Sequence, residues 1–316
     1  MISVLNYDRF IHAKDWDTLA SSGMNSDFMF MRDFIDYKKN INDHSVIVFD
    51  RNMPIAILPL GENGGPSSWK SHPGTSYGGL VFDRKYGGQK LSEVCAAIIL
   101  HLKNRGCKEL ILSLKPEFYN HPFASEEIYH WIKMGGHINR VRIGNVLLTG
   151  KHEVSNRRKR SLKKVLSTNF AFEYEASNMQ SVFEMAASNL LETHGVNPTH
   201  NFEELSKLQE MFPTKILTAA MRCVQSGEIV AGIILFENGN SSIIQYWGMK
   251  PKYRTLNVID HLILDVIANM SVNKRDFLVF GISTSGEEDY INQGIYDYKS
   301  SFGAGTYTAV DIRILI

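Results

Sequence analysis

The stretch from Gly248 to Leu262 (Gly-Met-Lys-Pro-Lys-Tyr-Arg-Thr-Leu-Asn-Val-Ile-Asp-His-Leu) constrains the fold of this 316-residue chain more than any other segment. It ends a predicted strand, turns through Pro251 and opens a helix with a continuous apolar stripe. The first N–H groups of a helix have no acceptor within the helix and lie at the positive end of its dipole. A strand that leads into a helix in this way is typical of an anion-binding turn, so we expect a site here.

Strand and helix signals alternate on both sides of this stretch. In the second half of the chain we predict helices over 179–192, 202–211 and 258–270, a helical candidate over 287–301, and strands over 215–224, 229–236, 242–248, 277–282 and 307–315. In the first half we predict helices over 11–20, 27–38, 89–104 and 125–134, strands over 45–49, 54–60, 77–82 and 109–114, a strand pair over 138–148, and a loop over 62–76.

The same order of elements occurs twice. Each half has two strands, then a strand with Tyr-x-Gly at one end (Tyr77-Gly78-Gly79 or Tyr246-Trp247-Gly248), then a helix and a further strand about 30 residues on. A tandem duplication explains this order, although any lobe of alternating helices and strands could show it. We therefore predict a mixed α+β fold of two tandem lobes, residues 1–150 and 151–316. Each lobe has a mixed, largely antiparallel sheet flanked by helices, and a basic helix precedes the second.

Charge and composition exclude several classes of function. Lys and Arg number 34 against 33 for Asp and Glu, so the chain has no global field that would gather a nucleic acid. The longest apolar runs, such as 229–236, are too short to cross a bilayer, and the first ten residues lack the apolar core of a signal peptide. Scattered histidines and three widely spaced cysteines give no metal motif. We expect a cytoplasmic protein without membrane insertion, metal or nucleic-acid partner.

The Pro-x-Tyr-Arg turn before the helix resembles the acyl-CoA-binding motif of GNAT N-acyltransferases, in which this turn holds the cofactor pyrophosphate. The resemblance implies acyl-CoA as the acyl donor. It places the cofactor against Gly248, Met249, Tyr253, Arg254, Thr255, Leu256, Asn257 and Ser283. The family pattern Arg-x-x-Gly-x-Gly is met in part, because Thr255, Asn257 and Ile259 stand where small residues are usual.

Two further segments resemble the Fem family of peptidoglycan-bridge transferases, which are tandem GNAT lobes. The first is the basic segment 156–166, which could also be a solvated connecting helix. The second is the segment 295–305 (Ile-Tyr-Asp-Tyr-Lys-Ser-Ser-Phe-Gly-Ala-Gly), which resembles the Fem signature aromatic-Lys-x-x-Phe-Gly-Gly. The resemblance places Tyr298 and Lys299 at the transfer site. The long heptad hairpin that some Fem enzymes carry is missing from the sequence.

The loop 71–79 (Ser-His-Pro-Gly-Thr-Ser-Tyr-Gly-Gly) resembles a segment of bacterial Fem-like acyltransferases that act on nucleotide-linked amino sugars in surface-polysaccharide synthesis. The resemblance implies an acceptor of this kind in a groove between the lobes. The acceptor-binding residues that we expect are His72, Tyr77, Gly78, Tyr246 and Arg158.

Amine attack on a thioester needs a group that accepts the amine proton, and His194 and Glu287 are the candidates. His194 follows the helix 179–192 and could equally cap its C-terminus, where the dipole favours the charged imidazole. Glu287 could equally complement the dipole at the start of the next helix. Lys299 lies among aromatic residues that would desolvate its ammonium, although it could also extend to solvent.

From these observations we expect an acyl-CoA-dependent N-acyltransferase. The amino group of a nucleotide-linked amino sugar would attack the thioester directly in a ternary complex, because no Ser-His-Asp or Cys-His constellation marks an acyl-enzyme site. Two alternatives stay open: a Fem-type aminoacyl-tRNA-dependent transferase acting on a peptidoglycan precursor, and a non-catalytic nucleotide or ligand binder with a degenerate GNAT site. The sequence leaves open the acyl chain, the sugar, the nucleotide, the general base and whether two copies form a homodimer.

Overall fold

The computed structural model describes residues 2–37, 41–120, 122–162, 169–286 and 288–316. The chain forms two compact units, one of Met1–Arg142 with Thr308–Ile316 and one of Ile143–Tyr307. The predicted lobes of residues 1–150 and 151–316 stay a prediction. Within the described ranges, every helix is too short or too polar to span a lipid bilayer.

The second unit, Ile143–Tyr307, contains a sheet in the order β8–β13–β12–β11–β10–β9. These strands are β8 (His137–Leu148, which enters the unit at Ile143), β9 (Phe170–Tyr174), β10 (Ile216–Cys223), β11 (Ile229–Asn238), β12 (Ser241–Met249) and β13 (Phe277–Ile282). All neighbours pair antiparallel except β12 and β13, which pair parallel. The sheet is therefore mixed and largely antiparallel, as the sequence predicts.

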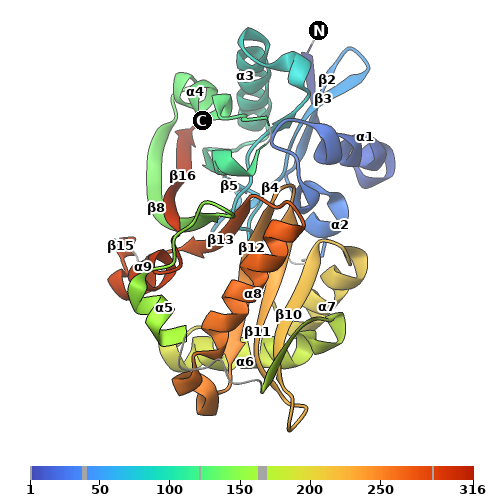
Figure 1. The fold of residues 1–316 in the computed structure, drawn as a ribbon. Coiled ribbons are helices and arrows are strands. Elements are labelled where there is room, and N and C mark those ends of the chain that lie inside the picture. Colours follow the sequence, from blue (N-terminus) through green and yellow to red (C-terminus); the bar gives the residue numbers. More distant parts are fainter. Residues whose placement is uncertain (1, 38–40, 121, 163–168, 287) are drawn as a thin grey trace. The chain divides into compact units, whose positions relative to one another are not determined.

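Helices cover both faces of this sheet. Helix α8 (Val258–Val272) lies in front of β11 and β12 in Figure 1, and its apolar stripe packs into one core with Ile233 and Leu235. Helix α6 (Met179–His194) packs on the opposite face, where glycines let its backbone come close. A Cβ added at Gly248 would lie 2.5 Å from the Ala186 backbone nitrogen. The remaining helices of the unit are α5 (Asn156–Leu162), α7 (Phe202–Met211) and α9 (Gln293–Ser300).

The parallel pair β12–β13 separates soon after it forms. Cα partners run from Ser241 opposite Phe277 to Ile243 opposite Val279. Beyond this point β12 continues to Met249 and β13 to Ile282. Among the described residues, these later parts of the two strands do not pair with each other. The two strand ends therefore diverge and leave a gap in the sheet.

The first unit repeats this pattern of pairing. Its strands are β1 (Ile2–Asn6), β2 (Val46–Asp50), β3 (Met53–Leu58), β4 (Leu60–Glu62), β5 (Ser68–Ser71), β6 (Val81–Phe82), β7 (Glu109–Ser113) and the end of β16 (Gly305–Leu315). Strands β1, β2, β3 and β6 pair antiparallel in that order, as β9 to β12 do. Gly78 then forms a parallel bridge with Leu114, and β7 pairs antiparallel with β16. The predicted duplication thus appears as one pairing scheme used twice.

The first unit differs from the second at the position of the gap. There the hairpin β4–β5 lies beside β7, and Ser68, Trp69 and Lys70 pair parallel with it. Trp69 belongs to the core of this unit, together with residues of α3 (Gln89–Asn104) and with Trp131 of α4 (Glu126–Lys133). An extra strand therefore occupies the edge that stays open in the second unit.

Three sequence predictions about individual elements are wrong. The expected strand pair over 138–148 is the single strand β8. The expected helix over 27–38 is a 3-10 turn, Phe28–Phe30, followed by the four-residue helix α2 (Arg32–Ile35). The expected loop over 62–76 contains β5, because pairing with β7 overrides the glycine- and proline-rich local sequence.

The close approach of α6 to the sheet gives a first prediction. Gly248→Ala should lower the free energy of unfolding by about 1–3 kcal/mol, because the new methyl group meets helix backbone that cannot rotate away. Gly294→Ala, in α9, is the matched control. A Cβ added there would lie 3.6 Å from the nearest atom, and alanine favours a helix. Urea denaturation of both variants measures the difference. Equal midpoints would contradict the packing described here.

Candidate functional site

A cavity of about 620 Å³ lies in the second unit where β12 and β13 diverge. The end of β12 forms one wall, the end of β13 forms the other, and α6, α8, α9 and Arg158 of α5 complete it. Seven residues that the sequence predicts for the site line this cavity together: Gly248, Met249, Arg254, Asn257, Arg158, Tyr298 and Lys299.

Lys299 is a buried cation at this cavity. Its side chain comes from α9, and the whole residue is 4% exposed. The ammonium donates hydrogen bonds to the Gly281 carbonyl (3.0 Å) and the Ile282 carbonyl (2.6 Å) at the end of β13. Within the described part of the chain it has no carboxylate partner, and burial lowers the pKa of Lys299 to about 8. One of its three N–H bonds is therefore left for a ligand in the cavity.

An ion pair joins three helices beside Lys299. Asp260, in the first turn of α8, is buried and accepts from the Arg158 guanidinium and from the Tyr298 hydroxyl (2.7 Å). The guanidinium also lies over the Tyr298 ring at 4.7 Å and donates to the Ser301 hydroxyl. Burial and the adjacent Asp260 carboxylate raise the pKa of Tyr298 well above its ordinary value. Tyr298 therefore stays protonated and holds α9 against α8.

The signature after Lys299 has a structural basis. Phe302 is fully buried in the core and packs against the Phe280 and Tyr298 rings. Gly303 has a φ of +90°, and a Cβ there would lie 2.7 Å from the Glu153 backbone nitrogen. Only glycine fits such a position without strain. This part of the pattern is thus explained by packing that fixes α9.

The turn before α8 takes a form that the sequence did not predict. Pro251–Leu256 form a 3-10 turn, and Asn257 then adopts the left-handed conformation, with a φ of +50°. Asparagine tolerates this conformation better than most residues, which explains how it replaces the usual glycine. The Val258 and Ile259 N–H groups that follow have no acceptor among the described residues, and Asn257 and Ile259 line the cavity.

Several predicted cofactor residues lie outside the cavity lining. The Tyr253 hydroxyl donates to Glu228 (3.1 Å), whose pKa is lowered to about 2 by hydrogen bonds from two lysines. Thr255 and Leu256 are exposed on the 3-10 turn. Ser283 is fully buried; its N–H donates to a backbone carbonyl and its hydroxyl to the Asn145 side chain. As cofactor ligands, these four residues stay predictions.

Four predicted acceptor residues contact neighbours within their own units. Tyr246, on the opposite side of β12 from the cavity-lining Trp247, bonds through its hydroxyl to His200. In the first unit, His72 donates through Nε2 to a backbone carbonyl, and the buried Tyr77 donates to Asp27 (2.8 Å). Gly78 packs against Ser71, where a Cβ would not fit. Their roles as acceptor ligands stay predictions.

The two candidate bases are not settled by the structure. His194 is the last residue of α6, and its side chain lies outside the described part of the chain. Glu287 lies outside the described residues altogether. No group of three or more His, Cys, Asp or Glu residues that could hold a metal occurs in the ranges that the structure describes.

Three residues at this cavity were not predicted from the sequence, Asp260, Asn189 and Thr193, although the last two carry a readable signal. Asn189 and Thr193 continue the face of α6 that begins with Ala186, at spacings of three and seven residues. Asn189 accepts the Met249 N–H (3.0 Å), a backbone group that the divergence of β13 leaves without a strand partner. The helical spacing of these two polar residues from the buried Ala186 was the signal.

No family model matches the sequence, and no curated protein matches it. Solved structures nevertheless share the fold. FemX superposes with a TM-score of 0.71 at 9% identity, over 99% of this chain and 97% of FemX. L-PGS from Bacillus licheniformis gives 0.62 at 9% identity, over 95% of this chain and 90% of that one. A tandem GNAT protein from the clavulanic acid biosynthesis pathway gives 0.52 at 11% identity, over 100% and 98%.

At these identities the similarity concerns the fold alone. The two-fold use of one strand-pairing scheme and the gap between β12 and β13 agree with it. The chain therefore has a mixed α+β, tandem GNAT-like fold similar to that of FemX, and the fold class predicted from the sequence is confirmed.

Proposed function

We propose that the chain is an N-acyltransferase that transfers an acyl group from acyl-CoA to the amino group of a nucleotide-linked amino sugar. The observation that carries the proposal is the cavity at the divergence of β12 and β13, which the first turn of α8 and Lys299 both border. The acceptor is inferred from the resemblance of the loop 71–79, and the donor from the turn before α8.

Donor binding is supported by the groups at the rim of the cavity. The Val258 and Ile259 N–H groups would donate to a pyrophosphate at the positive end of α8. Arg254 pairs with Glu192 at 3.1 Å, and both side chains are 48% exposed. Such an exposed pair contributes little to stability, so Arg254 can turn to a phosphate instead.

The transfer step follows from the groups inside the cavity. The acceptor nitrogen attacks the thioester carbonyl carbon, the C–S bond breaks, and the proton lost by nitrogen balances the one gained by the thiolate. Negative charge develops on the carbonyl oxygen, where the remaining Lys299 N–H would stabilise it. Tyr298, Asp260 and Arg158 would keep α9, and hence Lys299, in position.

The proposed reaction can be tested directly. Purified protein incubated with a panel of acyl-CoAs and nucleotide-linked amino sugars should yield one product heavier by the acyl group, measured by mass spectrometry. Lys299→Met should lower the turnover by about a hundredfold, because a preorganised donor is lost. Lys207→Met, at an exposed position of α7, is the control and should keep full activity. Full activity of Lys299→Met would remove Lys299 from the mechanism.

The pH dependence separates two roles for Lys299. Because its pKa is about 8, the ammonium that we propose as a donor is lost as the pH rises through this value. Deprotonation of the acceptor amine also changes the rate, but it affects wild type and Lys299→Met alike. The kcat/KM of wild type divided by that of Lys299→Met should therefore fall between pH 7 and pH 9, that is, across a pKa of about 8. A ratio that rises instead would make Lys299 a base.

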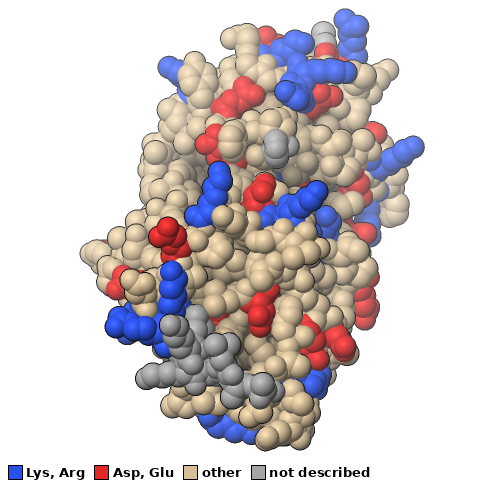
Figure 2. All heavy atoms as spheres, in the orientation of Figure 1, with Lys and Arg blue, Asp and Glu red and all other residues tan. Residues whose placement is uncertain are grey.

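The second candidate is a Fem-type transferase that takes its acyl group from aminoacyl-tRNA. The similarity to FemX over nearly the whole chain favours it. The near-neutral balance of charges speaks against a large polyanionic donor, and Figure 2 shows acidic and basic side chains interspersed on the face that it displays. Transfer from aminoacyl-tRNA with none from acyl-CoA would decide for this candidate. Binding of CoA thioesters without any product would instead favour a non-catalytic binder.

A further inference from the structure

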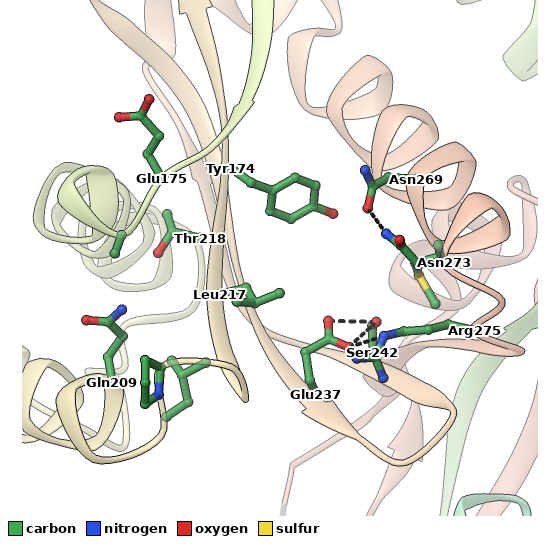
Figure 3. A pocket seen from close by; sticks show the side chains of 14 residues that line it. Tyr174, Glu175, Gln209, Leu217, Thr218, Glu237, Ser242, Asn269, Asn273 and Arg275 are labelled. Atoms are coloured by element: carbon green, nitrogen blue, oxygen red, sulfur yellow. Dashed lines mark hydrogen bonds and ion pairs between the residues drawn. The ribbon is translucent and has the colours of Figure 1, made fainter.

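A second cavity, of about 650 Å³, lies in the same unit at the opposite end of β12 (Figure 3). Ser242, near the start of β12, lines this cavity, whereas Trp247 lines the first one. The first residue of β12 that lines the first cavity is Ile244, two residues beyond Ser242, so the two cavities lie one after the other along the strand. The two cavities share no lining residue, so a ligand in one does not occupy the other.

Two of the three charged groups of the second cavity, Glu237 and Arg275, pair with each other, and the third, Glu175, is exposed and accepts a hydrogen bond from the Ser177 hydroxyl. Glu237, at the end of β11, is 2% exposed, and burial raises its pKa. Arg275 approaches this carboxylate at 2.7 Å and the Ser242 hydroxyl donates to it at 2.8 Å. The Arg275 guanidinium also donates to the Gly239 carbonyl (2.7 Å). Beside Glu237 an ionic ligand would therefore meet a neutral, pre-formed ion pair rather than an uncompensated charge.

Uncharged polar groups in the cavity have unused hydrogen-bonding capacity. Figure 3 shows the Tyr174 ring projecting from β9 toward α8, where Asn269 and Asn273 lie. The Asn273 amide donates to the Asn269 oxygen at 2.9 Å, which leaves the Asn269 NH₂ group and the Asn273 oxygen. Across the residues that the structure describes, the Tyr174 hydroxyl and the Asn269 NH₂ group have no hydrogen-bond partner.

The lining also includes apolar side chains, beside the further polar residues Gln209 and Thr218. Leu217 of β10 and Met270 of α8 lie beside the Tyr174 ring. The cavity thus combines an aromatic and aliphatic surface with uncharged donors and acceptors. A ring with one apolar face and several hydroxyl groups matches this combination, because each hydroxyl can both donate and accept.

We infer that this cavity is a second binding site, for an uncharged, hydroxyl-rich ring such as a neutral sugar. Tyr174 and Asn269 supply its hydrogen bonds, and Leu217 and Met270 support its apolar face. The site lies outside the proposed acyl-transfer cavity. Its occupancy therefore depends neither on acyl-CoA nor on turnover.

Saturation-transfer NMR on the full chain without acyl-CoA tests the site. The probes are methyl glucoside, methyl galactoside and N-acetylglucosamine, with glucose 6-phosphate and glucosamine as charged counterparts. A neutral sugar should bind saturably and more tightly than both charged ones. Tyr174→Phe and Asn269→Ala should each weaken it by about fivefold, the effect of one lost hydrogen bond.

Tyr290→Phe is the matched control, since Tyr290 is exposed and its hydroxyl bonds to Glu288 outside the cavity. It should leave sugar binding unchanged, as should Lys299→Met in the other cavity. Thermal unfolding checks that Tyr174→Phe is folded, which we expect because its hydroxyl has no internal partner. Lack of saturable binding by every neutral sugar at tens of millimolar, or binding that both cavity variants leave unchanged, would overturn the inference.

Discussion

The early separation of β12 and β13 is the constraint on which the second unit depends. Strands that diverge expose backbone groups that a neighbouring strand would otherwise pair, and such groups are costly when buried. Asn189 accepts the Met249 N–H, and Lys299 donates to the Gly281 and Ile282 carbonyls. Side chains thus replace the missing strand partner. The same side chains line the cavity, so the groups that stabilise the gap also give it its chemistry.

The first unit shows what happens when the gap is filled. At the position equivalent to the gap between β12 and β13, β5 of the first unit pairs with β7. Trp69 of β5 is buried in the core. Tyr77 bonds to Asp27, which pairs with Lys115 at 2.9 Å, and both charged side chains are 1% exposed. Buried pairs of this kind are held by their surroundings and are not free to exchange with a ligand. A cavity beside His72 in the first unit measures about 40 Å³, whereas the cavity at the divergence in the second unit measures about 620 Å³.

Much of this could be predicted from the sequence, for reasons that differ between residues. The repeated order of elements and the signature around Lys299 are local patterns, and they led to the fold class and to the buried lysine. Asp260 and Asn189 were missed because their roles depend on partners far away in sequence, Arg158 and Met249. His72 and Tyr77 were chosen from a loop of small residues, but their burial follows from tertiary packing that periodicity does not report. The pairing of β5 overrode local turn signals for the same reason.

We expect the opened sheet of the second unit to receive a thioester cofactor at the end of β12 and the start of α8. Hydrogen–deuterium exchange with and without acetyl-CoA tests it most directly. Exchange over residues 247–260 should slow on addition of the cofactor, with β10 residues 216–218 unchanged as an internal reference. Unchanged exchange over 247–260 at millimolar acetyl-CoA, or protection confined to other segments, would contradict it.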